Sequence, residues 1–326
     1  MEYIISLGSW VLTIGTIVAI YCILGLALNL HFGYTNLPNF GIAGFFAIGA
    51  YTSAILTVPH RFLEMEIFAG FPGGIPGRIE APFIVGILAA TVLAGFVAFL
   101  IGIPVLRLRE DYLAVASIGI AETIHFIALN ELWLTIGSAG IRLIPMPFAI
   151  LWPRYARPLF FLLVLLVLAI VYWVISRLVR SPFGRVWKAT REDETVTASL
   201  GKSIVRSRMW AWVIGCAFMG TAGSLWAHYA MAIQPGEFVP TTTFLVWIFV
   251  IVGGLRNNKG VLIGALVIIG LFEQGTRFLP AFGAPYVVPA LRLIIIGVLL
   301  VVFIRFRPQG VLPEKATTIE DHMKTI

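Results

Sequence analysis

The chain has 326 residues, of which 59% are hydrophobic and 12% are charged, whereas soluble domains average about 25% charged residues. This composition excludes a soluble enzyme, a disordered chain and a coiled coil. At about 20 residues per membrane-spanning helix, the apolar residues are enough for eight to ten spans. The net charge of +7 is typical of membrane proteins with basic cytoplasmic loops and does not indicate nucleic-acid binding.

Apolar runs bounded by charged residues, Pro or Gly predict nine membrane-spanning helices. In chain order they are Gly8–Leu30, Asn39–Val58, Pro82–Ile103, Tyr112–Leu134, Pro158–Val179, Met209–Ile233, Thr241–Val252, Val261–Leu279 and Val288–Ile304. The predicted fold is an all-α polytopic integral membrane protein with about nine (8–10) transmembrane helices, some of them broken. Residues 1–305 form one transmembrane domain with a long polar loop at 180–208, and residues 306–326 form a C-terminal tail.

The distribution of basic residues predicts the orientation. If the loop at 180–208 is cytoplasmic, 16 of the 23 Lys and Arg residues fall on the cytoplasmic side and 7 on the other side. Short loops rich in Lys and Arg stay in the cytoplasm. We therefore expect an external N-terminus and a cytoplasmic C-terminus in the cytoplasmic (inner) membrane.

The polar loop predicts a short helix from Thr190 to Gly201. Thr190 is the expected N-cap, and Glu192, Asp193 and Glu194 fall in the first turn, where carboxylates stabilise the positive helix end. Gly201 stands where a glycine commonly ends a helix. A helix of about 10 residues is marginal alone in water, so it either packs on its own protein or docks on a cytoplasmic partner. Both readings stay open at this point.

The same loop contains a false nucleotide motif. Gly201-Lys202-Ser203 matches the end of a P-loop, but Val196 stands where the motif requires its first glycine. No other segment offers a nucleotide site, so a process driven by ATP needs another chain to bind it. The chain also lacks the metalloprotease and nucleophile-elbow signatures, and we expect neither an enzyme nor a metal site.

Ionisable residues inside spans are costly and therefore mark candidate functional positions. Glu122 and His125 are spaced i, i+3 in the fourth predicted span, within hydrogen-bonding reach of each other. They form a polar clamp to another helix, line a transport pathway or gate, or relay protons in a secondary transporter.

Two predicted helix breaks are further candidates. Asn36, Pro38, Asn39, Gly41 and Gly44 cluster before the second span, and Gly253 and Gly254 follow the seventh. Non-helical backbone at membrane depth must be buried in protein or line a cavity. In transporters, broken helix ends often bind the charged groups of the solute, which would suit a zwitterionic amino acid. The simpler alternative at the first break is an ordinary loop with Asn39 as an N-cap.

Four segments, in order, resemble the permease subunits of branched-chain amino acid ABC importers, specifically the LivM-type member of the permease pair. They are FGYTNLPNFGIAGFFAIGAYTSAIL (32–56), LRLREDYLAVASIGIAETIHFI (106–127), SPFGRVWKATREDETVTASLG (181–201) with GTAGSLWAHY (220–229), and VGGLRNNKGVLIGALV (252–267) with FRPQGVLP (306–313). The resemblance covers nearly the whole chain.

The resemblance implies a heteromeric importer with a second related permease, two cytoplasmic ATPases that bind ATP and Mg²⁺, and an extracytoplasmic solute-binding protein. It implies that the loop helix is the element that couples the permease to the ATPases, through Thr190, Arg191, Glu192, Asp193, Glu194 and Gly201. The resemblance also allows other solutes, because related permeases of this family transport urea or short amides. These solutes remain alternatives to branched-chain amino acids. A proton-coupled secondary transporter that uses Glu122 and His125 is a further alternative.

Overall fold

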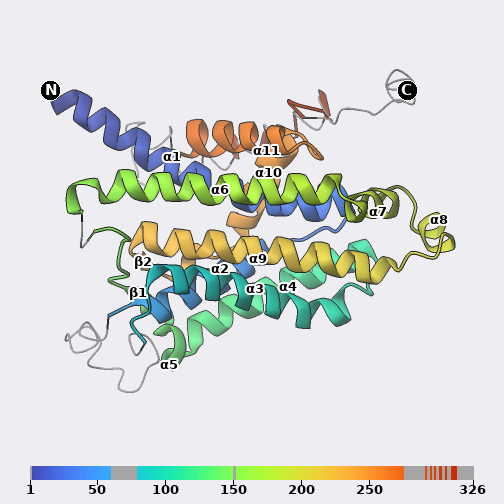
Figure 1. The fold of residues 1–326 in the computed structure, drawn as a ribbon, viewed down its shortest axis with the longest axis horizontal. Helices are drawn as coiled ribbons and strands as arrows, with labels where there is room; N and C mark the ends of the chain where they lie inside the picture. Colours follow the sequence, from blue (N-terminus) through green and yellow to red (C-terminus); the bar gives the residue numbers. More distant parts are fainter. Residues whose placement is uncertain are drawn as a thin grey trace.

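The computed structural model describes residues 2–59, 79–149, 152–274 and 310–313, together with residues 291, 294, 295, 297, 298, 301, 302, 305 and 306. In Figure 1, the long helices of this part run roughly side by side along one axis. The start of α1 lies at one end of this bundle, and α7 and α8 project from the other end (Figure 1).

The described helices are α1 (Glu2–Leu28), α2 (Ile42–Thr57), α3 (Phe83–Val105), α4 (Glu110–Asn130), α5 (Leu132–Thr135), α6 (Ala156–Arg180), α7 (Pro182–Glu192), α8 (Glu194–Ser199), α9 (Ile204–Ala230), α10 (Pro240–Gly253) and α11 (Asn258–Ala265). π-Helical segments continue α1 and α11 over Asn29–Gly33 and Leu266–Gln274. Strands β1 (Ile141–Arg142) and β2 (Ala232–Ile233) pair antiparallel, with Ile141 opposite Ile233.

Within the described residues, 6 helical segments are long and apolar enough to cross a membrane: Trp10–Gly33, Phe83–Val105, Glu110–Asn130, Pro153–Arg180, Ile204–Ala230 and Pro235–Gly253. Two shorter apolar helices are Ile42–Thr57 and Asn258–Phe272. The first eight predicted spans all fall on these helices, so the all-α polytopic membrane fold is confirmed. Of the ninth predicted span, Val288–Ile304, the structure describes only residues 291, 294, 295, 297, 298, 301 and 302, all of them helical. The rest of that span and most of the tail at 306–326 lie outside the described residues.

The core forms where α9 packs against α2 and α3. This crossing is close because glycines face backbone: a Cβ on Gly49 of α2 would lie 2.0 Å from the carbonyl oxygen of Gly220 in α9. A Cβ on Gly223 would lie 2.0 Å from the carbonyl oxygen of Phe46. Small residues permit such approach between membrane helices. Helix α1 packs along α6 and α9, and the side chains of Trp212, Phe45 and Phe46 are almost completely buried at the centre.

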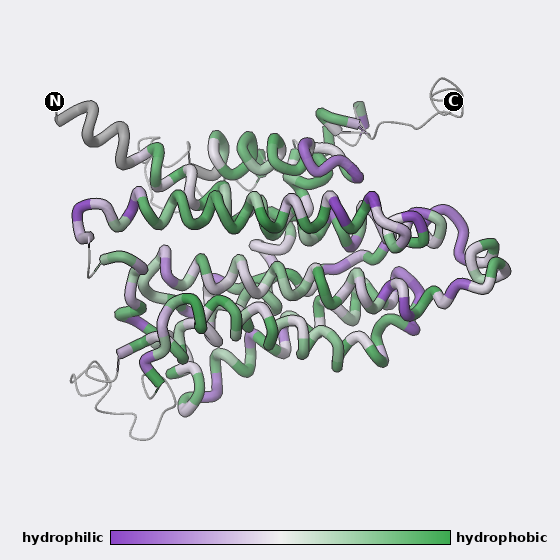
Figure 2. Tube along the Cα trace, viewed as in Figure 1, coloured by the Kyte–Doolittle hydropathy of each residue, from purple (hydrophilic) through white to green (hydrophobic). Residues whose placement is uncertain are grey.

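Hydropathy divides the bundle along its length. Figure 2 shows apolar residues along α3 and α6 and hydrophilic residues concentrated around α7 and α8. We call this end, which contains α7, α8 and the starts of α4, α9 and α11, the basic end. The opposite end, with β1 and β2, is the β end.

The polar loop differs from its prediction, because it forms two helices where one was expected. Ser181 is the N-cap of α7, with Pro182 at the first helical position, a combination that favours helix initiation. Thr190 is therefore not an N-cap and lies in the last turn of α7. The chain is extended at Asp193, which is the N-cap of α8. The predicted N-cap was Thr190, whereas the N-cap of the second helix is Asp193, three residues later.

Candidate functional site

The backbone before α2 is the buried helix break that the sequence predicts. Residues 36–41 are non-helical, and Leu37 and Asn39 are buried, while Pro38 is half-buried. At the basic end, Asn36 adopts a positive φ of 52° and donates from Nδ2 to Oε1 of Glu110 at 2.7 Å. The segment thus runs inward from the basic end and is enclosed by protein, as non-helical backbone inside a membrane must be.

Asn39 joins this segment to the end of the first span and to α10, although it is not the N-cap of α2. The N-cap is Gly41, whose N–H donates to Oδ1 of Asn39 at 2.7 Å. Nδ2 of Asn39 lies 3.1 Å from Nδ1 of His31. Nε1 of Trp247 in α10 donates to the carbonyl oxygen of Asn39 at 3.0 Å. The side-chain amide and the carbonyl of this asparagine therefore have partners in the core.

His31 is a member of this network that the sequence interpretation missed. Its Nε2 lies 3.1 Å from the carbonyl oxygens of both Ala211 and Trp212, and its ring stacks on the indole of Trp212. Carbonyl oxygens only accept hydrogen bonds, so Nε2 carries the hydrogen and Nδ1 accepts from Asn39. His31 is therefore a neutral, structural histidine. The signal in the sequence was a polar residue at the end of an apolar run, and its partner Ala211 is 180 residues away.

The N-terminal amides of α2 are bound to protein groups. The N–H of Phe40 donates to Oγ of Ser117 in α4 at 2.9 Å, and the N–H of Ala43 donates to Oγ1 of Thr243 in α10 at 3.1 Å. Gly44 contacts α4 closely, since a Cβ there would lie 2.9 Å from the Cα of Ala121. These bonds fix α2, α4 and α10 to one another. They also occupy backbone N–H groups that, by the sequence interpretation, could bind a solute.

Glu122 and His125 are both half-buried on α4. Oε2 of Glu122 and Nδ1 of His125 are 4.0 Å apart, and the two side chains are 34% and 18% exposed. This distance is too long for a hydrogen bond. Neither side chain bonds to another helix among the described residues, and Nδ1 of His125 has no hydrogen-bond partner there. Within this part of the chain the pair is not an interhelical clamp.

Beside this pair lies an apolar groove of 720 Å³ between α2, α3 and α4. Its aliphatic and aromatic lining includes Ile48, Val92 and Phe96. Tyr51 contributes a hydroxyl that is buried and has no hydrogen-bond partner among the described residues. The groove therefore offers a long apolar surface with few polar groups along it.

At the basic end, α7 is fixed to the bundle by polar contacts. Nε1 of Trp187 donates to the carbonyl oxygen of Ser207 in α9 at 2.9 Å, and Thr190 is buried. NH1 of Arg191 donates to the carbonyl oxygen of Gly33 at 3.0 Å. The coupling candidate Arg191 is thus bonded to the end of the π-helical segment Asn29–Gly33, which directly precedes the buried helix break.

Helix α8 is N-capped but largely exposed, whereas α7 is fixed against the bundle. Oδ1 of Asp193 accepts hydrogen bonds from the backbone N–H groups of Thr195 and Val196 and from the hydroxyl of Thr195. These bonds hold the pKa of the Asp193 carboxyl below its usual value. Val196 and Leu200 are 56% and 73% exposed, and Gly201 ends the helix with a φ of +73°. Two apolar side chains therefore project from a short polar helix.

Ion pairs connect α8 to the bundle. NH2 of Arg208 in α9 pairs with Glu194 of α8 and lies 3.8 Å from Oε1 of Glu110 in α4. Glu192 pairs with Arg191, and the hydrogen bonds and charge of that guanidinium lower the pKa of its carboxyl. Because Glu110 also accepts from Asn36, these contacts connect α8, α4 and the helix break.

The second predicted break is also observed. Helix α10 ends at Gly253, and Gly254 has a φ of 119°. The segment at 310–313 lies against this break: the N–H of Val311 donates to the carbonyl oxygen of Val252 at 2.9 Å, and Leu312 donates to Gly253 at 3.1 Å. The glycine-rich segment after α10 and the FRPQGVLP segment are therefore in contact.

Among the residues described, no group of three or more His, Cys, Asp or Glu side chains has the arrangement of a metal site. The polar contacts bring together the buried break, the start of α4 and helices α7 and α8, which we call the α7–α8 projection. Glu122 and His125 take no part in these contacts.

Comparison with known proteins agrees with this architecture. Residues 10–304 match a family model described as a branched-chain amino acid transport system permease component. LivM of Escherichia coli K12, a high-affinity branched-chain amino acid transport system permease protein, is 33% identical over 95% of this chain and 71% of its own length. The probable LivM permease of Methanocaldococcus jannaschii is 31% identical over 91% of each chain, and the probable LivH permease of that organism is 23% identical over 82% of this chain and 80% of its own. No solved structure matches the chain.

Proposed function

Because the chain belongs to the branched-chain amino acid transport permease family, we propose that it is a transmembrane subunit of an ABC importer for branched-chain or related amino acids. It works with a second related permease and two cytoplasmic ATPases. An extracytoplasmic protein delivers the solute. ATP and Mg²⁺ are bound by the ATPases, and this chain performs no hydrolysis itself.

The observation that carries this proposal is the α7–α8 projection. Val196 and Leu200 are spaced i, i+4 and are largely exposed, so they present one apolar patch at the tip of the bundle. Exposed apolar patches commonly mark protein interfaces. The patch is connected to the transmembrane part through Arg208 and Arg191. Movement of an ATPase bound at α8 is thereby transmitted to α4 and to the helix break.

The basic end faces the cytoplasm in this proposal. It carries most of the Lys and Arg residues, as the positive-inside rule requires. Helix α1 begins at the opposite end from α8 (Figure 1), which supports an external N-terminus. The segment at 310–313 contacts the end of α10 at the basic end, which supports a cytoplasmic C-terminus.

The solute moves along the part of α4 that carries Glu122 and His125 and the groove beside it, between this chain and the second permease. A carboxylate such as Glu122 in the middle of a span costs several kcal/mol when it faces lipid, and its 34% exposure favours a polar pathway or a partner. The adjoining groove is apolar, which suits aliphatic side chains. Alternating access of this pathway is driven by ATP binding and hydrolysis in the partner subunits.

The importer is tested by purification of the tagged chain in mild detergent from its native membrane. The proposal predicts that a second permease and two ATPases accompany it. Recovery of a chain that transports leucine by itself would contradict the proposal.

Two alternatives are distinguished by uptake measurements. For a permease of urea or short amides, the associated binding protein binds those solutes and leucine does not compete with them. For a proton-coupled transporter that uses Glu122 and His125, an uncoupler abolishes uptake at constant ATP, whereas the proposed importer continues to transport.

A further inference from the structure

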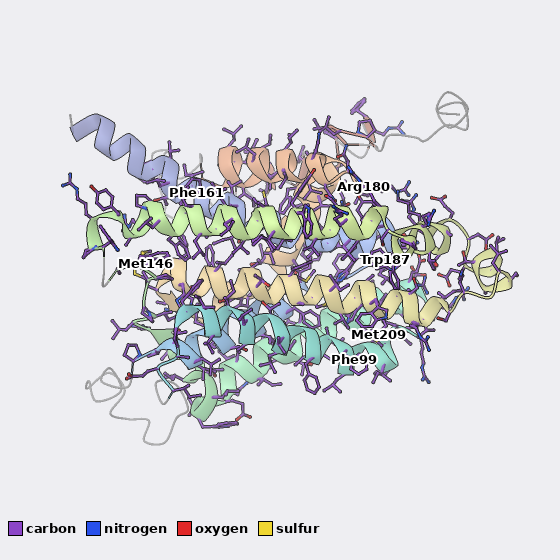
Figure 3. All side chains as sticks on the ribbon, in the orientation of Figure 1. Phe99, Met146, Phe161, Arg180, Trp187 and Met209 are labelled. Carbon is purple, nitrogen blue, oxygen red and sulfur yellow. The ribbon has the colours of Figure 1, made fainter. Side chains whose placement is uncertain are left out.

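A cavity of 240 Å³ opens between α7 and α9 at the basic end. Val196 and Leu200 do not line it, and its lining combines two cations with two aromatic rings. The lining residues are Pro182, Phe183, Val186, Lys202, Ser203, Arg206, Ser207 and Trp210. In Figure 3, Trp187 is labelled on α7 and Met209 on α9, the two helices that form the cavity, although neither residue lines it.

Three side chains of this cavity have no polar partner among the described residues. Lys202 and Arg206 are exposed, and neither forms an ion pair with the described part of the chain. Ser207 is 8% exposed, and its Oγ is buried without a hydrogen-bond partner among the described residues. An unpaired buried hydroxyl costs about 1–3 kcal/mol, so a ligand with acceptor oxygens would satisfy it.

The backbone adds donors at the same place. Helix α9 starts at Ile204, and the side chain of its N-cap, Ser203, makes no capping hydrogen bond. The first amides of a helix are unpaired and carry a partial positive charge, which favours anions. Two cations, a buried hydroxyl and the start of a 27-residue helix therefore converge on one cavity.

The aromatic residues indicate where the ligand comes from. Phe183 and Trp210 line the cavity and are 58% and 53% exposed. In the last turns of α6, the ring of the exposed Trp173 lies 5.5 Å from the guanidinium of Arg177. Tryptophans beside cations are typical of the level of lipid headgroups. We propose that this cavity binds the phosphate group of an anionic phospholipid from the leaflet at the basic end.

In this site, Lys202 and Arg206 pair with the phosphate oxygens, and Ser207 donates to one of them. Phe183 and Trp210 contact the glycerol and the first methylenes of the acyl chains. The bound lipid connects α7 to α9 beside the α7–α8 projection. This proposal depends on the orientation given under the proposed function only for which leaflet supplies the lipid.

The test uses the full chain with its co-purifying subunits, delipidated in detergent. The sample is titrated separately with phosphatidylglycerol, with phosphatidylcholine and with inorganic phosphate. Native mass spectrometry counts the bound lipid molecules. Wild-type protein should retain phosphatidylglycerol in preference to phosphatidylcholine. At about 1 kcal/mol for each cation near a membrane surface, K202Q/R206Q should weaken this binding roughly 30-fold. S207A should weaken it a few-fold, in proportion to one hydrogen bond.

The matched control is R185Q/K188Q, which removes the same charge from α7 at residues that do not line the cavity. It should change phosphatidylglycerol binding less than about threefold. Equal losses in both double variants would overturn the proposal in favour of general surface electrostatics. Displacement of the lipid by inorganic phosphate would contradict the proposal that a phospholipid is the ligand. It would indicate instead that the cavity binds free phosphate. Neither outcome bears on whether ATPases co-purify.

Discussion

At the scale of single residues, the buried break before α2 depends on the amide of Asn39, which bonds to His31 and Gly41, while its carbonyl accepts from Trp247. Asn39→Ala leaves the N–H of Gly41 and Nδ1 of His31 without these partners. We expect a loss of about 1–3 kcal/mol in the free energy of unfolding, measured as a lower midpoint of thermal denaturation in detergent.

Asn130→Ala is the control for this change. Asn130 is exposed and donates to the carbonyl oxygen of Phe126 in its own helix, so its loss should cost less than about 0.5 kcal/mol. Equal destabilisation by the two substitutions would contradict a structural role of the Asn39 network.

The sequence predicted part of this site and missed part of it. The cluster from Asn36 to Gly44 indicated a break, because Gly, Asn and Pro disfavour a continuous helix. The partners of Asn39 could not be predicted, since His31 and Trp247 come from separate helices whose packing is set by the whole bundle. The spacing of Glu122 and His125 allowed a hydrogen bond, but their side chains are 4.0 Å apart.

At the scale of helices, glycines set the crossing of α10 and α11. A Cβ on Gly264 would lie 2.1 Å from the carbonyl oxygen of Phe249, and backbone cannot move aside as a side chain can. Gly264→Ala should destabilise the protein by about 1–3 kcal/mol or more, measured by thermal denaturation. Gly119→Ala is the control, because a methyl group added there would have nothing within 4 Å; similar losses in both variants would contradict the close crossing.

The cap of α8 gives a prediction for pH. The hydrogen bonds from Thr195 and Val196 lower the pKa of Asp193, so its carboxylate stabilises α8 at neutral pH. This contribution is present above the pKa of the unfolded chain and is lost as the pH falls through the lowered pKa. Hydrogen exchange should show faster exchange of the Thr195 and Val196 amides in Asp193→Ala than in Asp193→Asn, which keeps a capping oxygen.

In that experiment, acidification should accelerate exchange of these two amides in the wild type, relative to the intrinsic rate, and leave Asp193→Asn unaffected by the same titration. Unchanged protection in Asp193→Ala would show that α8 does not depend on its cap.

The exposed side of α8 gives a prediction for assembly. Val196→Ser/Leu200→Ser should leave the fold intact, because both side chains are largely exposed. Burial of a Val or Leu side chain contributes about 1.5–3 kcal/mol, so the affinity for the ATPases should fall roughly 100-fold. The measurement is the amount of ATPase that co-purifies with the tagged chain.

Leu143→Ser/Phe148→Ser is the matched control, since it removes two exposed apolar side chains at the β end. It should retain the ATPases. Loss of the ATPases from both variants, or from neither, would place the interface elsewhere.

At the scale of the whole molecule, composition and apolar runs predicted the architecture well. Eight of the nine predicted spans fall on described helices, because the bilayer requires long apolar helices and the sequence shows them directly. The division of the polar loop into α7 and α8 was not predicted. Thr190 and Asp193 are both capable caps, and the choice between them depends on the burial of Thr190 against the bundle.

In the proposed function, the energy for solute transport comes from partner ATPases. Leucine uptake into proteoliposomes tests this energy source, with the purified complex in the membrane, the external binding protein outside and ATP enclosed. We expect uptake that requires hydrolysable ATP, persists with an uncoupler and fails in Val196→Ser/Leu200→Ser. Uptake by this chain alone, driven by a proton gradient without ATPase subunits, would contradict it.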